Sequence, residues 1–202
     1  DDRLEGGNDH DLLYGEAGND DISGNAGMDL LDGGAGVDVL RGGDDDDELL
    51  AGTGIGDALY GGAGNDRLVG SDEGAATDPD FADATFFGDR MYGDDWLFGL
   101  GGADLLDGGI GNDRIDSGIG ADRVEAGDGA DWVFAGRGVY GDVVFAGAGD
   151  DEVYGNHTGD DELHGEDGND RLFGQGGNDE LFGEADGDYL DGGADADVIH
   201  GG

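Results

Sequence analysis

Aspartate recurs along this chain at intervals of about nine residues, and this regular spacing of carboxylates is the first sign of chemistry. In nineteen successive segments an Asp is followed, two positions later, by Leu, Ile or Val. Carboxylate oxygens are ligands for hard cations, so these aspartates are candidates for cation binding. The candidate metal ligands are Asp11, Asp20, Asp29, Asp38, Asp47, Asp57, Asp66, Asp95, Asp104, Asp113, Asp122, Asp131, Asp142, Asp151, Asp161, Asp170, Asp179, Asp188 and Asp197.

The overall charge supports a role for cations. The 202 residues include 52 Asp and Glu but only eight Arg and no Lys, which gives a net charge of −44 at pH 7. This balance excludes nucleic acid as a partner. Self-repulsion on this scale leaves two possibilities: the chain is disordered, or cations are part of its fold. The chain has no Cys. No stretch reaches the roughly 18 apolar residues of a membrane helix, so we expect no membrane insertion by this segment.

The aspartates belong to a nine-residue template, G-G-x-G-x-D-x-U-x, in which U is a large aliphatic residue. Clear copies begin at Gly61, Gly108 and Gly165. The sixth position is Asp and the eighth is Leu, Ile or Val in all nineteen copies, whereas the first position is Gly in fifteen and the fourth in fourteen. The strict positions are therefore a carboxylate and an apolar side chain, and the looser ones are glycines.

The template predicts a short strand after a tight turn. The apolar residue at position eight, with one variable residue on each side, fits a three-residue strand whose middle side chain points inward. Glycines in the first four positions supply the positive φ angles and close backbone approach that the preceding turn requires. Because one such strand buries almost nothing alone, successive strands must alternate between two parallel sheets, with eighteen residues per coil.

This pattern resembles the RTX (repeats-in-toxin) family, whose nonapeptides form a calcium-binding parallel β-roll in proteins exported by Gram-negative bacteria. The resemblance covers nearly the whole chain. It implies an all-β fold: a right-handed parallel β-roll, or two-sheet β-solenoid, with calcium in the turns. It also implies that calcium lies between the turns of repeats n and n+2, held by sixth-position Asp carboxylates and backbone carbonyls.

The resemblance also predicts which aspartates share an ion. Five n to n+2 pairs in the first seven copies and ten in the remaining twelve give about 15 sites at full occupancy, and we expect about 10–15 calcium ions. The stacked pairs include Asp11 with Asp29, Asp20 with Asp38, Asp38 with Asp57, Asp104 with Asp122, Asp151 with Asp170 and Asp179 with Asp197.

Some copies depart from the template and are expected to bind weakly or not at all. The copy beginning at residue 52 has Ile55 where Gly is expected, with an extra Ala51 before it. The copy at residue 155 has one extra residue around Thr158, and those at residues 88 and 135 have two each. We expect these insertions to widen a turn without shifting the strand that follows.

One segment, residues 70–87, lacks the template and separates residues 1–69 from residues 88–202. It is either a degenerate coil that binds no calcium or an insertion that loops out while the roll closes beneath it. Ala75 and Ala84 stand where metal-binding Asp would be needed, which favours the loop. In either case we expect one continuous elongated domain made of two β-roll blocks.

The residues at positions seven and nine should face solvent, and the two faces differ. One is rich in aromatic residues and the other in charged ones, a difference that fits either a structural ladder of rings or a glycan- or partner-binding surface. The aromatic face of the second block comprises Trp96, Phe98, Trp132, Phe134, Tyr154, Phe173 and Tyr189, interrupted by Arg114 and Asp116. The other face carries mainly Asp107, Arg123, Glu125, Glu162 and Glu180, with Phe145 and Phe182.

No catalytic motif accompanies the repeats. The chain has neither H-E-x-x-H nor G-x-S-x-G, which argues against a zinc protease and a lipase-type nucleophile. The four histidines are interpreted as surface residues, with His164 and His200 at the outward position nine. We therefore expect no enzymatic activity from these residues.

The sequence predicts a secreted calcium-binding structural module that folds on calcium binding outside the cell. It would be extracellular or at the cell surface, as part of an adhesin, surface layer, fibre or toxin. The alternatives are the C-terminal accessory domain of a type I-secreted hydrolase, and a glycan- or partner-binding module. Because both ends fall within a repeat, we also expect either a piece of a longer array or end-to-end self-association. The expected partners are calcium ions and either further copies of the chain or other surface proteins.

Overall fold

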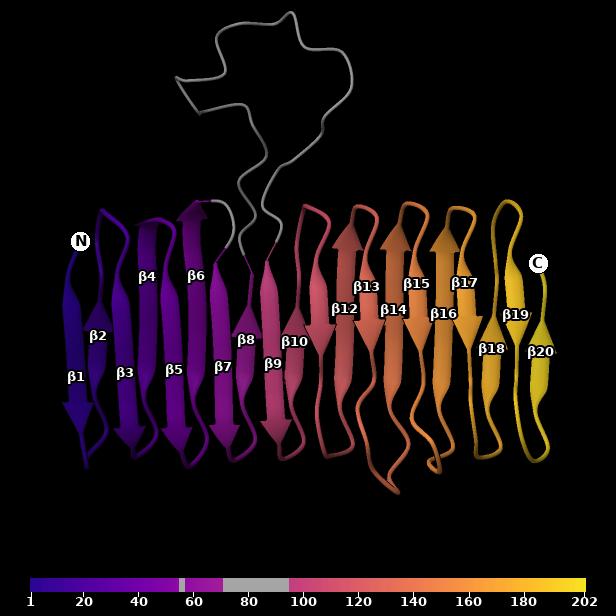
Figure 1. Cartoon of the computed structure of the whole chain (residues 1–202), viewed down its shortest axis with the longest axis horizontal. Coiled ribbons are helices and arrows are strands. Elements are labelled where there is room, and N and C mark those ends of the chain that lie inside the picture. Colours follow the sequence, from indigo (N-terminus) through magenta and orange to yellow (C-terminus); the bar gives the residue numbers. More distant parts are fainter. Residues whose placement is uncertain (55–56, 71–94) are drawn as a thin grey trace, which may run out of the picture.

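The computed structural model describes residues 1–54, 57–70 and 95–202. Within these ranges the chain forms twenty strands and no helix, and the strands make two sheets of ten. Figure 1 shows a long rod in which the coils follow one another in chain order, with the two termini at opposite ends. The expected all-β, two-sheet parallel roll is confirmed.

Odd-numbered strands form one sheet and even-numbered strands the other, and we call them the odd sheet and the even sheet. All strand pairs are parallel and join strand n to strand n+2, as between β3 and β5 or β14 and β16. The odd sheet comprises β1 (Arg3–Gly7), β3 (Asp21–Ala26), β5 (Val39–Asp44), β7 (Ala58–Ala63), β9 (Trp96–Gly101), β11 (Arg114–Asp116), β13 (Trp132–Phe134), β15 (Glu152–Tyr154), β17 (Arg171–Phe173) and β19 (Tyr189–Asp191). The even sheet comprises β2 (Leu12–Tyr14), β4 (Leu30–Gly36), β6 (Glu48–Gly54), β8 (Arg67–Val69), β10 (Leu105–Asp107), β12 (Arg123–Asp128), β14 (Val143–Ala148), β16 (Glu162–Asp167), β18 (Glu180–Phe182) and β20 (Val198–His200).

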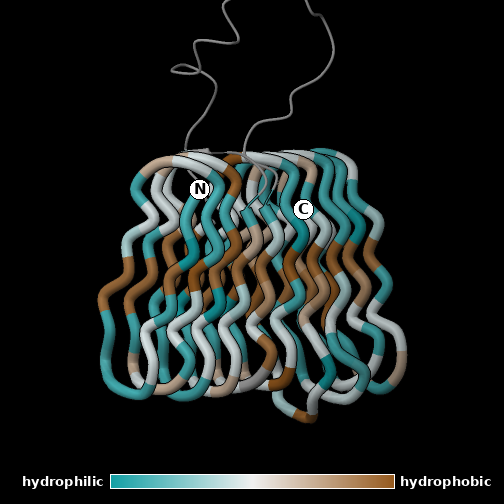
Figure 2. Tube along the Cα trace, turned by 60° about the vertical axis from the view of Figure 1, so that its left-hand side comes forward, coloured by the Kyte–Doolittle hydropathy of each residue, from teal (hydrophilic) through white to brown (hydrophobic). Residues whose placement is uncertain are grey.

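The core is a column of eighth-position side chains between the two sheets. In the odd sheet Ile22 pairs with Leu40, and Leu40 in turn pairs with Leu59, so each apolar residue lies on its equivalent one coil away. From Ile22 to Leu181 these residues are fully buried. Figure 2 shows the resulting hydrophobic band midway along the strands of successive coils. The alternation of outward, inward and outward side chains in each three-residue strand is therefore confirmed.

The turns stack so tightly that many of their glycines leave no room for a side chain. Gly149, at position four, has φ 144°, and a Cβ there would lie 1.5 Å from the carbonyl oxygen of Gly129 in the preceding coil. In three copies an Asp takes the left-handed conformation at position four in place of Gly: Asp45 with φ 80°, Asp186 with φ 73° and Asp195 with φ 82°. Asp tolerates this region better than most residues, which explains why it replaces Gly in these turns.

The two blocks of repeats pair directly with each other. β7 pairs with β9 and β8 with β10, so both ladders continue from the first block to the second. The predicted segment 70–87 lies outside the described residues except for Gly70, as do Ala75 and Ala84. Counting the two blocks separately therefore omitted the stacked pairs that join them.

The irregular copies keep their strands in register. The two extra residues of the copy at residue 135 leave Val143 paired with Arg123, as expected. The alignment of the copy at residue 52 was wrong: Gly34, at position two of its own copy, pairs with Gly52, and Gly36, at position four, pairs with Gly54. Ala51 therefore takes position one, and the extra residue falls within residues 55–56, outside the described residues.

Candidate metal sites

Each sixth-position Asp lies at the start of a strand, where its carboxylate reaches along the rod to the backbone of the preceding coil. The backbone N–H of Asp151 donates to Oδ1 of Asp170 at 2.9 Å, and that of Asp131 donates to Oδ1 of Asp151 at 2.7 Å. The same bond recurs along both rows of turns, so the aspartates form one column beside each sheet edge. The pairs singled out from the sequence, such as Asp104 with Asp122, are stacked in this way.

In many of these carboxylates the second oxygen, Oδ2, is buried and has no hydrogen-bond partner. An unpaired buried carboxylate oxygen is costly, so this repetition suggests a site for a cation. The residues whose Oδ2 atoms are in this position include Asp20, Asp29, Asp38, Asp47, Asp57, Asp66, Asp104, Asp151, Asp170, Asp179 and Asp188.

Glycine at position one keeps the space around this oxygen open. A Cβ on Gly165 would lie 2.5 Å from Oδ2 of Asp170 and 2.9 Å from the carbonyl oxygen of Gly183. The carboxylate of one coil and a backbone carbonyl of the next thus face the same small space. Within the described part of the chain, no three His, Asp or Glu side chains converge to make a cation cage. Any cation held here would be shared between carboxylates and backbone carbonyls.

Burial and mutual repulsion disfavour the ionised form of these carboxylates when no cation is bound. Burial is the largest cause, and it raises the pKa of Asp57, Asp104 and Asp151 from 3.8 to about 7. A backbone N–H bond lowers each pKa, but neighbouring carboxylates of the column raise it further. The charged groups acting on Asp151 are Asp131, Asp170 and Asp150, all of them acidic.

Basic side chains of the described residues form ion pairs elsewhere, on the outer faces of the sheets. Arg67 pairs with Glu48 at 2.8 Å, and Arg123 pairs with Glu125 at 2.7 Å, all four side chains being about half exposed. The N-terminal ammonium lies 3.7 Å from Oδ1 of Asp20 at the first coil. The columns are therefore strongly negative, and their oxygen-only, glycine-lined spaces fit Ca²⁺, which takes six to eight oxygen ligands in flexible geometry.

The candidate ligands expected from the sequence left out one member of the columns, Asp2, and the pairing left out the contacts between the two blocks. The N–H of Asp2 donates to Oδ1 of Asp20, which makes Asp2 a further sixth-position residue; it precedes Leu4 by two positions, as the template requires. Across the junction of the blocks, Asp57 stacks on Asp95. Asp66 stacks on Asp104 in the same way. These three stacked pairs come in addition to the fifteen expected.

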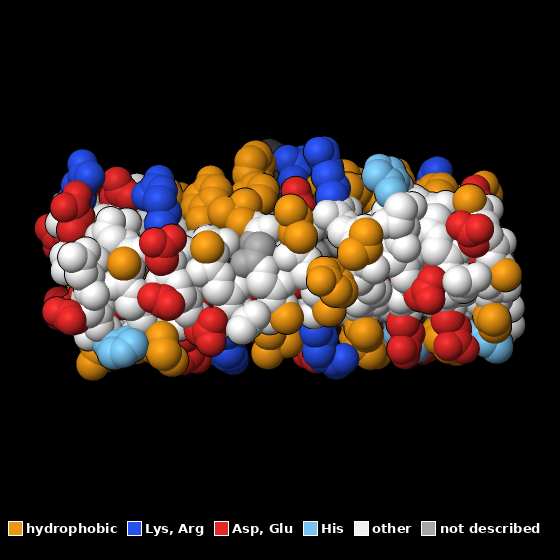
Figure 3. Space-filling view, turned by 90° about the horizontal axis from the view of Figure 1, so that it is seen from below, with side chains coloured by type: hydrophobic (Ala, Val, Ile, Leu, Met, Phe, Trp, Pro, Cys, Tyr) orange, Lys and Arg blue, Asp and Glu red, His pale blue; other side chains and the backbone are white. Residues whose placement is uncertain are grey.

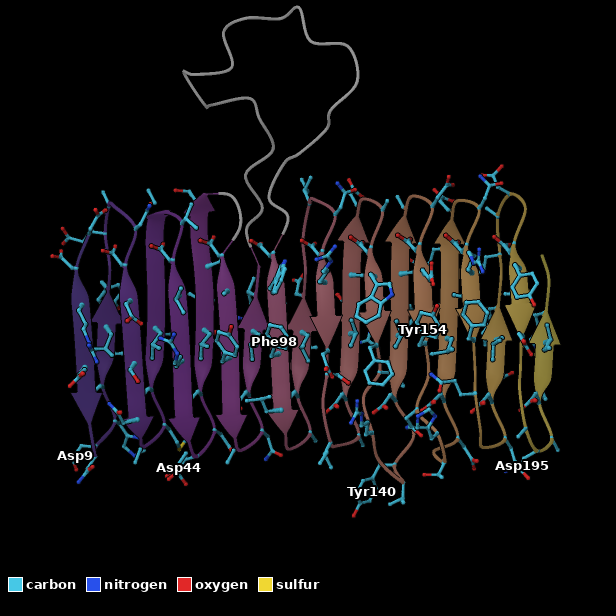
Figure 4. All side chains as sticks on the ribbon, viewed as in Figure 1. Asp9, Asp44, Phe98, Tyr140, Tyr154 and Asp195 are labelled. Atoms are coloured by element: carbon cyan, nitrogen blue, oxygen red, sulfur yellow. The ribbon has the colours of Figure 1, made fainter. Side chains whose placement is uncertain are left out.

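The outer face of the odd sheet carries the aromatic column expected from the sequence. Tyr154 stacks on Phe173 with ring centroids 4.8 Å apart, and Trp132 lies 6.1 Å from Tyr154. The structure adds Tyr60, which stacks on Phe98 at 5.1 Å across the junction of the blocks. Figure 4 shows rings such as Phe98 and Tyr154 along this face, with Asp9, Asp44, Tyr140 and Asp195 at the lower turns.

The outer face of the even sheet also carries stacked rings, and two of them are histidines. The ladder runs Phe145–His164–Phe182–His200, with centroids 4.5–4.7 Å apart. His164 points outward as expected, but the interpretation of it as a solvated surface residue is wrong. Its side chain is only 14% exposed because it lies between two rings and between Glu162 and Glu184. Figure 3, which views the lower turns, shows hydrophobic and charged side chains along both long edges.

Comparison with known families identifies the repeat. The model of the RTX calcium-binding nonapeptide repeat matches residues 1–31, 23–56, 56–73, 91–124, 115–140, 138–157, 156–190 and 173–202. These repeats bind calcium ions, and many copies imply many ions; proteins that contain them are typically secreted. No curated protein matches the chain significantly. The described residues contain no helix of the length and apolarity needed to cross a membrane.

Proposed function

Because this chain belongs to the RTX calcium-binding nonapeptide repeat family, we propose that it is a secreted structural module whose folding is driven by calcium outside the cell. The observation that carries this proposal is the column of buried carboxylates with an unpaired oxygen, exemplified by Asp151 and Asp170. The proposed ligands are the nineteen sixth-position aspartates and Asp2, together with backbone carbonyls of the turns.

The mechanism follows from the electrostatics of the columns. At neutral pH and low calcium, folding would bury carboxylates such as Asp57 and Asp104, whose pKa is raised to about 7, beside others of the same charge. The chain then favours the unfolded state, in which the carboxylates are hydrated and far apart. Bound calcium supplies the missing positive charge between coils. The free energy of binding thereby becomes free energy of folding.

The residues present also support a structural role. The repeat is a structural calcium-binding module, and its described aspartates stack in pairs from coil to coil along the turns. We propose that the chain is not catalytic and serves in an adhesin, surface layer, extracellular fibre or toxin. An accessory role in a type I-secreted hydrolase is the alternative, and a catalytic domain on the same polypeptide would identify it.

The aromatic column offers a second candidate function, the binding of a glycan or protein partner. Trp96 and Trp132 are 46% and 43% exposed, which leaves ring surface available to a ligand. The close stacking of Tyr154 on Phe173 favours instead a ladder that stabilises the sheet. Replacing Trp96 and Trp132 by Ser distinguishes ligand binding from a structural ladder. If the ladder is purely structural, the double variant loses stability but still binds whatever glycan or protein the wild-type chain binds.

The test of the main proposal is a calcium titration of the whole chain at pH 7.5, followed by circular dichroism and X-ray scattering. We expect an expanded chain in chelator and a rod with strand signal in millimolar calcium. Magnesium at the same concentration is the control, and it should not replace calcium because it favours rigid octahedral, partly hydrated sites. A rod with full strand signal in chelator at pH 7.5 would contradict the mechanism.

A further inference from the structure

Asn156 occupies an unusual place among the turns of the even column. It is fully buried, at position two of the copy that begins at Gly155. Its side-chain Nδ2 lies 2.6 Å from the carbonyl oxygen of Tyr140, 3.0 Å from Oδ2 of Asp142 and 3.0 Å from Oδ1 of Asp161. One nitrogen thus lies among three oxygens contributed by two successive coils.

The two carboxylates around this nitrogen are a stacked pair of the kind described above. The N–H of Asp142 donates to Oδ1 of Asp161 at 2.8 Å, as elsewhere in the columns. The difference is in the second oxygens: Oδ2 of Asp142 accepts from the Asn156 side chain, and Oδ2 of Asp161 accepts from the Asn156 backbone N–H at 2.7 Å. The equivalent atoms of Asp151 and Asp170 have no hydrogen-bond partner.

Asparagine at position two does not reach this space in every copy. Asn25 occupies the same position in its copy, but it has φ 81° and is exposed, and its amide contacts the carbonyl of Ser23 at 3.3 Å. Asn156 is not among the residues with positive φ, and its side chain turns inward. The outcome therefore depends on the turn and not on the residue type alone.

The irregular turns on both sides hold Asn156 in place. Its Oδ1 accepts from the N–H groups of Thr158, at 3.0 Å, and Gly159. A Cβ on Gly159 would lie 2.4 Å from the Asn156 amide nitrogen, so only Gly fits there. Thr158 Oγ1 also donates to the carbonyl of Gly138 at 2.5 Å, which ties this turn to the widened one that carries Tyr140. Figure 4 shows Tyr140 at the tip of that turn.

We propose that the Asn156 side-chain amide takes the place of the calcium ion between Asp142 and Asp161, so that these two coils are joined without an ion. This inference rests on the proposed function, since it concerns which of the stacked pairs hold calcium. An ion at this point would need its ligand oxygens at 2.3–2.6 Å, in the space that the amide fills. Each carboxylate remains available to its other neighbour in the column, Asp122 for Asp142 and Asp179 for Asp161.

The extra residues in these two copies place the groups that surround the Asn156 side chain. The additional residue of the copy at residue 155 lets the turn fold around the Asn156 side chain, and the widened turn of the copy at residue 135 supplies the Tyr140 carbonyl. The sequence departures that suggest a weak calcium site instead build a hydrogen-bonded joint. This joint requires no calcium and should be the part of the rod least sensitive to chelation.

The test is a crystal structure of the calcium-loaded chain with an anomalous difference map for calcium. We expect peaks between other stacked pairs, such as Asp151 and Asp170, and none between Asp142 and Asp161. Asn156→Gly should gain a peak there, whereas the control Asn25→Gly should leave the set of peaks unchanged.

Two results would overturn the inference. The first is a wild-type peak within about 2.6 Å of oxygens of both Asp142 and Asp161. The second is an Asn156→Gly crystal without a new peak at that position. If Asn156→Gly does not crystallise, the wild-type map still decides between occupancy and absence. A map without any calcium peak would instead refute the proposed function, and the present inference with it.

Discussion

Acid should stabilise the calcium-free form of this protein, the reverse of ordinary acid denaturation. The perturbation is a fall from pH 7.5 to pH 5 in the presence of a chelator. Burial holds the pKa of column carboxylates such as Asp104 and Asp151 at about 7 in the fold, against an ordinary value of 3.8. Between these two values the folded chain binds more protons than the unfolded chain. The free energy of unfolding therefore rises as the pH falls through this window.

The size of the effect follows from the number of such groups. Five aspartates have a pKa raised to about 7 and three to about 6. One pKa unit corresponds to about 1.4 kcal/mol, so a group at about 7 contributes at most about 2.7 kcal/mol between pH 7.5 and pH 5. Solvent screening and coupling between neighbours reduce the sum severalfold, and we expect a total gain of about 5 kcal/mol. This gain is comparable with the whole stability of a typical domain.

The assay is circular dichroism of the chelated chain during a sucrose titration at each pH. Sucrose favours the compact state and brings a marginal fold into the measurable range. We expect the sucrose concentration at the folding midpoint to be lower at pH 5 than at pH 7.5, with sedimentation confirming that the chain stays monomeric. In saturating calcium the same fall in pH should weaken the fold, because protons then compete with the ion. A chelated chain whose midpoint is unchanged or higher at pH 5 would refute the reasoning.

Three further predictions follow from single positions. Asp151→Asn removes a buried charged ligand and should raise the calcium concentration at the folding midpoint about tenfold. Asp150→Asn, at its exposed neighbour, should shift that midpoint much less in the same titration, because Asp150 acts on Asp151 only through its charge. Gly149→Ala forces a Cβ against the preceding coil and should lower the free energy of unfolding, measured in urea with calcium, by more than about 2 kcal/mol. Asp186→Gly, at the equivalent turn position, should cost no stability in the same assay. Leu163→Ala leaves a cavity in the fully buried column and should cost about 2–5 kcal/mol in that assay, and a loss below about 1 kcal/mol would contradict the close-packed core.

The template predicts local structure well because each repeat repeats the same physical constraints. An inward Leu or Ile at position eight, as in Leu40 and Leu163, has one buried location available in a three-residue strand. A sixth-position Asp one residue before that strand must then lie at the sheet edge, above its equivalent in the next coil. Period and residue type therefore predict the two sheets, their register and the aspartate columns without knowledge of long-range contacts.

Irregular positions could not be predicted in this way, because their outcome depends on neighbours in other coils. The template position of Ala51 was misassigned, because a local template cannot tell which of two adjacent residues begins a widened turn. The pairing of Gly52 with Gly34 identifies that residue as Ala51. His164 was interpreted as a solvated residue because its position faces outward. Its stacking between Phe145 and Phe182 becomes evident only when strands about eighteen residues apart in sequence are laid side by side.

The sequence by itself determined the repeat, the alternating two-sheet roll and the acidic columns that fit calcium, because these depend on interactions renewed in every coil. Only the tertiary structure decided how the two blocks join, with Asp66 stacked on Asp104, and what Asn156 does. The physical reason is that both outcomes require groups from different coils to meet. An amide that hydrogen-bonds two carboxylates from successive coils is indistinguishable, in a linear sequence, from an asparagine exposed on a turn.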